Sequence, residues 1–132
     1  MKPLYLIACS AAKLDRNAPA AQLYQGQAFK LAMAAAERAG ADVIILSALH
    51  GALFPDLTID PYNLTLSAMT AQQRRQWAAN VRHALSEYNG REIVVLAGKH
   101  YAAAVDTFPN VSRPLAGQGI GQQLHTLKHL NA

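Results

Sequence analysis

The chain contains a single cysteine, Cys9, so no disulfide can form within it. No His and Cys residues stand at the spacing of metal ligands, and we expect neither a metal site nor a cofactor. His125 and His129 lie one helical turn apart without an apparent third ligand, so we interpret both as surface residues of the last helix.

Long apolar runs are also absent. No stretch approaches the roughly 20 apolar residues that a membrane-spanning helix needs, and no signal-peptide pattern follows Met1. A lone cysteine is typical of a reducing compartment. We therefore expect a cytoplasmic protein without a membrane partner.

Charged residues make up only 15% of the 132 residues, against 52% hydrophobic ones, which predicts one globular domain over residues 1–132. The net charge of +4 weakly favours anionic partners such as nucleotides or nucleic acid. Only Arg74 and Arg75 are adjacent among the basic residues, so the sequence shows no dense basic stripe.

The hydrophobic pattern alternates between strands and helices. Apolar runs predict strands at about residues 4–9, 43–46 and 93–97, with a weaker edge strand near 111–115. A first helix begins either at Pro19 or after Gly26, and a capping box at Thr70 and Gln73 starts a second one. A short helix is expected near 101–106.

The last helix carries Ile120, Leu124 and Leu127 on one stripe. Leu124, Leu127 and Leu130 either pack on the chain's own core or form the seam of a homodimer.

This order predicts an α/β, three-layer, Rossmann-like fold with a mostly parallel four-stranded sheet and helices on both faces. We expect the flavodoxin-like strand order 2-1-3-4, with a long loop over residues 52–67. In such sheets, ligands bind beyond the carboxyl ends of the strands. We therefore expect the functional residues to lie at this edge.

The first strand ends in a turn that contains Cys9, Ser10 and Lys13. Cys9 is either a nucleophile or a small buried side chain. Lys13 is either a nucleophile or phosphate ligand, or an ordinary surface lysine. We expect Lys13 and Ser10 to be the working groups, with Cys9 packed behind them.

The second strand is followed by Ser47, His50 and Gly51. His50 is either a general acid or base, or a structural hydrogen-bonding group, and Gly51 indicates a bend or a close ligand approach. In the loop beyond, Asp56 or Asp60 could activate water or bind ribose, and Tyr62 could stack on a base. Solvated acids and ordinary loop packing are the alternatives.

Glycines and a lysine follow the later strands, at Gly98, Lys99, Gly117 and Gly119. Glycines before a helix let backbone N–H groups approach a phosphate. Their spacing matches neither the P-loop nor the dinucleotide fingerprint, so we expect phosphate contacts here without assigning a known motif.

Three segments together resemble a family of small uncharacterised bacterial and phage proteins, and more distantly the peroxide stress protein YaaA family. They are Cys9-Ser10-Ala11-Ala12-Lys13-Leu14, Leu23-Tyr24-Gln25-Gly26 and Leu46-Ser47-Ala48-Leu49-His50-Gly51, continued by Pro61-Tyr62-Asn63-Leu64. The resemblance implies a DNA-associated or stress-response role and adds Tyr24, in a Tyr-x-Gly segment, to the substrate-binding residues.

The turn from Cys9 to Lys13 is also similar to one in the catalytic core of archaeosine synthases. That resemblance implies that Lys13 attacks the nitrile of a deazaguanine in RNA.

Together these observations favour an enzyme that acts on a nucleotide or nucleobase, by N-glycosidic cleavage or base modification. Lys13, His50 and Asp56 would be its catalytic residues. The substrate would be bound by Cys9, Ser10, Tyr24, Ser47, Gly51, Tyr62, Gly98, Lys99, Gly117 and Gly119. The alternatives are a non-catalytic nucleotide or nucleic-acid binding protein in stress response or phage defence, and a scaffold.

Overall fold

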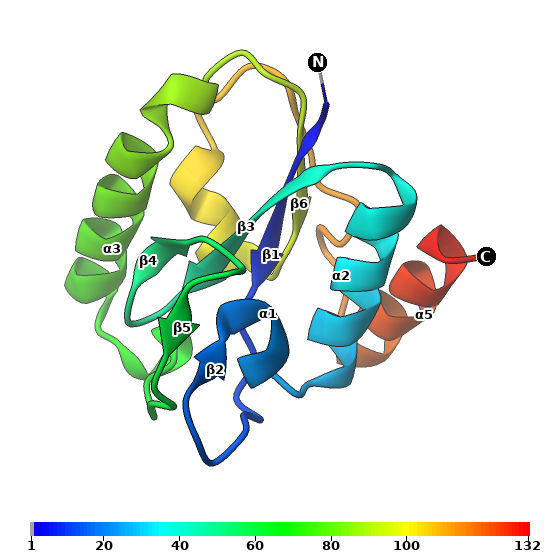
Figure 1. The fold of residues 1–132 in the computed structure, drawn as a ribbon. Coiled ribbons are helices and arrows are strands. Elements are labelled where there is room, and N and C mark those ends of the chain that lie inside the picture. The colour runs from blue at the N-terminus through cyan, green and yellow to red at the C-terminus, as the bar shows by residue number, and fades with distance from the viewer. Residues whose placement is uncertain (1) are drawn as a thin grey trace.

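The computed structural model describes residues 2–132, and its centre is a five-stranded sheet (Figure 1). The strands stand in the order β4-β3-β1-β6-β7. β1 pairs with β3 and β6, and β6 with β7, all in parallel, whereas β4 runs antiparallel to β3. Their bounds are Leu4–Ala8 (β1), Asp42–Ser47 (β3), Gly51–Leu53 (β4), Ile93–Leu96 (β6) and Val111–Ser112 (β7).

The prediction of a mixed α/β chain with a mostly parallel sheet is confirmed, but the expected number of four strands is wrong. The additional strand is β4, which turns back after Ser47 and pairs with the end of β3. The turn is possible because Gly51 has a φ of +70°, a backbone conformation that residues with a Cβ rarely adopt. Three residues are too few for the alternation of a strand to show in a sequence.

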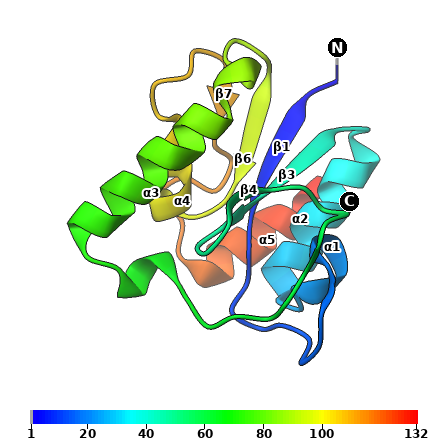
Figure 2. The ribbon, with the colours of Figure 1, turned by 60° about the vertical axis from the view of Figure 1, so that its left-hand side comes forward.

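Helices cover both faces of the sheet (Figure 2). Side chains alternate along β1, so Leu6 packs on one face with Trp77 and Val81, while Ile7 packs on the other with Phe29 and residues of the last helix. The first face is covered by α3 (Ala71–Ala84), α4 (Lys99–Ala102) and the 3₁₀ turns η2 (Ser86–Tyr88) and η3 (Ala103–Val105). The second is covered by α1 (Ala20–Leu23), α2 (Gln27–Arg38) and α5 (Ile120–Leu130).

The capping box that predicts the start of α3 is confirmed. The Thr70 hydroxyl accepts a hydrogen bond from the Gln73 N–H at 3.1 Å, and the Gln73 side chain accepts one from the Thr70 N–H at 2.8 Å. The first helix of the chain is divided, because Tyr24 has an extended backbone and forms a bridge with Lys13. Both expected starting points, Pro19 and Gly26, therefore begin a helix.

The segment expected to be one long loop is mostly irregular but contains short elements. After β4 it forms β5 (Thr58–Ile59), which pairs with β2 (Ala18–Pro19), and then the 3₁₀ turn η1 (Leu66–Ala68). The short ribbon of β2 and β5 holds the loop against the turn that follows β1. This contact positions Tyr62.

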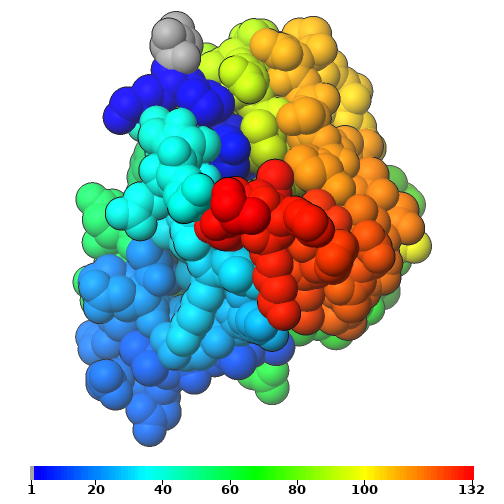
Figure 3. Space-filling model, turned by 90° about the vertical axis from the view of Figure 1, so that its right-hand side faces the viewer, coloured from blue at the N-terminus to red at the C-terminus, as the bar shows by residue number. Residues whose placement is uncertain are grey.

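The last helix lies beside α2 on the surface (Figure 3). Leu127 is 1% exposed and belongs to the chain's own core, so it cannot form a dimer seam. Ile120, the first residue of the predicted apolar stripe, is 81% exposed. No helix among residues 2–132 has both the length and the apolar character to cross a bilayer.

Candidate functional site

The carboxyl ends of β1, β3 and β6 meet at one edge of the sheet. In the register, Ala8 stands beside Leu46, and Ile7 beside Leu96. The turns that follow these three strands therefore start at the same level. This places the three predicted groups of site residues, which start at Cys9, Ser47 and Gly98, along one edge.

Ser47 is fully buried there, and its hydroxyl is the centre of a hydrogen-bond chain. It accepts the His50 N–H at 3.0 Å and lies 2.7 Å from the Tyr62 hydroxyl, which lies 2.6 Å from the Tyr24 hydroxyl. The chain joins β3, the loop after β5 and the end of α1. It is satisfied internally, as a buried polar group requires.

Lys13 and His50 flank this chain. The Lys13 ammonium lies 4.4 Å from the centre of the Tyr62 ring and 5.8 Å from that of Tyr24, within the range of a cation–π contact. The His50 ring meets the Tyr62 ring edge-on at 5.5 Å. Five predicted residues thus come together, and we call them the tyrosine cluster: Lys13, Tyr24, Ser47, His50 and Tyr62.

Two further residues belong to this region, although the sequence analysis did not select them. The Tyr101 hydroxyl lies 3.4 Å from the Cys9 sulfur, and the Trp77 ring packs edge-on against Tyr101 at 5.5 Å. Trp77 also donates a hydrogen bond to the Ser47 carbonyl at 2.9 Å. Tyr101 could have been selected, because it follows closely on the third predicted strand. Trp77 could not, because its position in the sequence is that of an ordinary core residue of its helix.

Burial raises the pKa of Tyr24, Tyr62 and Tyr101 above the ordinary value of a phenol. The removal of these groups from water is the largest cause in each case, because it penalises the phenolate. The three phenols stay protonated at neutral pH. They can donate hydrogen bonds to a ligand but cannot act as bases.

A cavity of about 540 Å³ opens at the same edge, between the first turns of α2 and α5. Cys9, Ser10 and Gly26 line one side, and Gly98 and Gln123 line the other. No acidic side chain lines it. Most of its lining is apolar, with alanine, leucine, isoleucine and phenylalanine side chains. Helix N-termini present free N–H groups and favour negative charge, so the anionic end of a ligand would lie at the first turns of α2 and α5.

A second hollow of about 440 Å³ adjoins the first and shares Gly98 and Gln123 with it. It brings together Lys99, Arg113 and Gly117. Gly117 has a φ of +74°, so its turn favours glycine. The predicted Gly119 is the residue that precedes α5 and lines neither hollow.

The Ser10 side chain stabilises the turn that follows β1 through two hydrogen bonds. Its hydroxyl accepts the Gly26 N–H at 3.1 Å and donates to the Ala12 carbonyl at 2.8 Å. The sulfur of Cys9 lies against the hydroxyl of Tyr101.

Asp56 is not brought to the tyrosine cluster. It lies exposed in the turn after β4, which a hydrogen bond from the Leu57 N–H to the Phe54 carbonyl closes. Because β4 leads back from Ser47 towards Ile45, this turn lies away from the carboxyl edge. Gly51 serves the turn into β4, opposite Ser47. Among residues 2–132, no three His, Cys, Asp or Glu side chains gather as metal ligands.

A family of unknown function, DUF6884, matches residues 4–129. The chain belongs to this family. A comparison with curated proteins found no match. The family match spans the tyrosine cluster and both hollows, and its description names no activity.

Proposed function

We propose that this protein binds a nucleotide or nucleobase at the carboxyl edge of the sheet and acts on it by N-glycosidic cleavage or base modification. The observation that carries the proposal is that a cavity without acidic side chains adjoins the tyrosine cluster. Ala12 lines the cavity, and Lys13, the next residue, lies 4.4 Å from the centre of the Tyr62 ring. A largely apolar cavity bordered by two helix N-termini, next to an aromatic and cationic cluster, suits a nucleotide.

In this proposal, the phosphate lies by the first turns of α2 and α5, near Lys99. The base lies by Tyr62 and His50, whose rings offer a stacking surface. The sheet order is then flavodoxin-like and the fold three-layered, with the ligand beside β1, where the strand order reverses.

For hydrolysis, a water oxygen bonds to the sugar carbon while the bond from that carbon to the base nitrogen breaks. The base keeps the electron pair and takes up a proton. His50 is the group to remove the proton of the water, because Asp56 lies elsewhere. The protonated Tyr62 phenol can hydrogen-bond to the departing base.

For base modification, Lys13 is the nucleophile. The resemblance to archaeosine synthases supports an attack of its amine on a nitrile carbon, with the nitrile nitrogen taking up the proton. The amine is held over the Tyr62 ring and near the Ala11 carbonyl, which orients it.

The test is a thermal-shift screen with nucleobases, including a nitrile-bearing deazaguanine, nucleosides and nucleotides, followed by chromatography of the incubated ligands. We expect a rise in Tm with at least one of them and a modified or released base. Lys13→Gln and His50→Ala should abolish the product, and Lys128→Gln, a change at an exposed position in the last turn of α5, should leave it unchanged.

Failure of every nucleotide and base to raise the Tm would contradict the proposal. Binding without a product would favour the non-catalytic alternative, which the absence of a carboxylate from the cavity lining also supports.

A further inference from the structure

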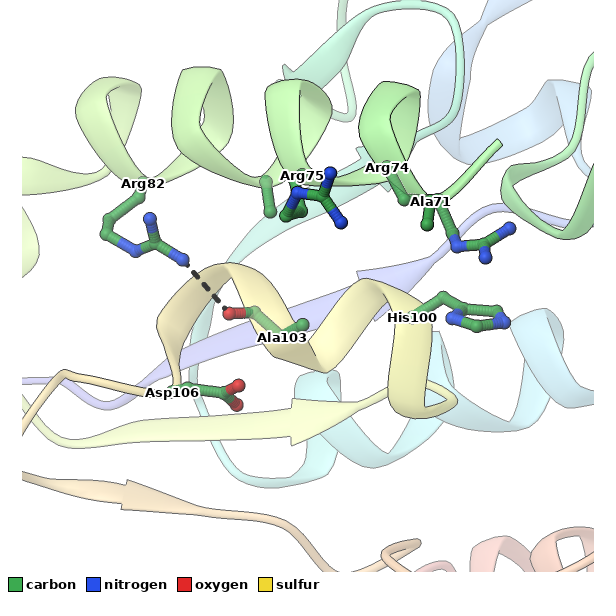
Figure 4. Close-up of a pocket in the computed structure, with 8 residues that line it drawn as sticks. Ala71, Arg74, Arg75, Arg82, His100, Ala103 and Asp106 are labelled. Carbon is green, nitrogen blue, oxygen red and sulfur yellow. Dashed lines mark hydrogen bonds between the residues drawn. The ribbon is translucent and has the colours of Figure 1, made fainter. Parts of the chain in front are cut away.

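A groove of about 460 Å³, separate from the two hollows at the carboxyl edge, lies between α3 and the α4–η3 segment (Figure 4). Arg74, Arg75 and Arg82 line it from α3, and His100 lines it from α4. In the sequence only Arg74 and Arg75 appear together. The helix places Arg82 two turns further along the same groove, so the basic surface exists only in the folded chain.

The arginines of this groove keep their charge uncompensated. Among residues 2–132, the ion pairs join Asp15 to Arg16, Asp42 to Arg91 and Asp106 to Arg113, and none involves a groove arginine. Asp106 is the acidic residue in the lining, and its partner is Arg113 at 3.4 Å.

The hydrogen bonds of these arginines leave capacity for a ligand. Arg74 donates to the carbonyls of Leu66 and Met69, and Arg82 donates to that of Ala103 at 3.3 Å. The Nε of Arg82 is buried without a hydrogen-bond partner. Arg75 is exposed. A guanidinium has five N–H donors, so a ligand with several acceptor oxygens can be bound here.

The positive charge of the groove also acts on His100. Its pKa lies below the ordinary value for histidine, because of partial burial and the positive charges of Arg74 and Lys99.

We propose that this groove binds the phosphodiester backbone of a nucleic-acid strand. The spread of the cations decides against a single phosphate. Eight residues separate Arg74 from Arg82, which corresponds to about 12 Å along the helix. A stacked strand rises about 3.4 Å per nucleotide, so the groove would span three to four phosphates. Arginine is the side chain that best matches phosphate oxygens.

The groove lies next to the carboxyl edge. His100 and Tyr101 are adjacent in α4, and while His100 lines the groove, the Tyr101 hydroxyl meets Cys9. A strand in the groove would therefore place a nucleotide beside the cavity, so that the base acted upon would belong to a polynucleotide. Only this last step rests on the proposed function.

The experiment is fluorescence anisotropy with labelled single-stranded DNA and with RNA of the same sequence, over a range of salt concentrations. We expect binding at about 50 mM salt and a log–log salt slope of about −2 to −3, from three to four phosphate contacts on a single strand. Arg75→Glu should weaken binding about tenfold or more and make the slope shallower. Lys30→Glu, an equal charge reversal at an exposed position of α2, should weaken binding much less.

Three results would overturn the inference: no binding of either strand at low salt, equal weakening by Arg75→Glu and Lys30→Glu, or full displacement by inorganic phosphate at constant ionic strength. Arg82→Gln gives a second variant, and circular dichroism shows whether each variant folds. The nucleotide thermal shift at the carboxyl edge should be unchanged in Arg75→Glu, so the groove and the cavity can fail independently.

Discussion

Gly26 lies so close to Ser10 that a side chain at position 26 does not fit. A Cβ added to Gly26 would stand 2.7 Å from the Ser10 Cβ. Its N–H donates to the Ser10 hydroxyl at 3.1 Å. The contact joins the turn after β1 to the first turn of α2, and so shapes one wall of the candidate cavity.

Gly26→Ala should therefore lower the free energy of unfolding by about 1 to 2 kcal/mol. The overpacking against Ser10 costs more than the alanine contributes by reducing the entropy of the unfolded chain. Gly121→Ala is the matched control, since no atom lies within 4 Å of an added Cβ there. It should stabilise α5 by about 0.5 kcal/mol. Urea denaturation measures both. Equal effects of the two variants would show that the approach to Ser10 is unimportant.

The buried tyrosines should make the protein sensitive to alkali. The raised pKa values of Tyr24, Tyr62 and Tyr101 mean that, above about pH 10, the unfolded chain loses phenol protons that the folded chain keeps. Stability is then complete below pH 10 and falls as the pH rises. The slope can reach about 1.4 kcal/mol per pH unit for each tyrosine.

Urea denaturation at about pH 9, 10 and 11 measures this slope. Tyr62→Phe removes one of the three phenols and should reduce the slope by about a third. An absorbance titration in which all phenols ionise near pH 10 would contradict the assignment.

The pair of Asp42 and Arg91 should stabilise the fold at neutral pH and lose this effect in acid. Arg91 binds the Asp42 carboxylate and the Lys2 carbonyl, which joins the starts of β1, β3 and β6. The hydrogen bond from Arg91 lowers the pKa of Asp42 below its ordinary value, 3.8. The contribution is present above that pH and is lost as the pH falls through the lowered pKa.

Asp42→Asn should therefore reduce the urea denaturation midpoint at neutral pH, and the difference from the wild type should shrink as the pH falls below 3.8. Asp56→Asn, an exposed carboxylate outside any ion pair among the described residues, is the control and should change neither. A deficit in Asp42→Asn that persists at acid pH would point to packing instead.

The parallel strands could be predicted because their patterns are local. Ile44, Ile45 and Leu46 are apolar without interruption, as strands covered on both faces require. Once the strands are parallel, their carboxyl ends share an edge, so Cys9, Ser47 and Gly98 were placed correctly along it. The start of α3 was equally local, since Thr70 and Gln73 cap each other three residues apart.

Contacts between distant residues were decided only by the folded chain. The Tyr62 hydroxyl reaches Ser47 and Tyr24, which are 15 and 38 residues away, because the β2–β5 ribbon carries the loop there. The basic groove likewise needs α3 and α4 side by side. Periodicity records which face of an element is apolar, but not which elements a loop brings together, since that depends on packing over the whole core.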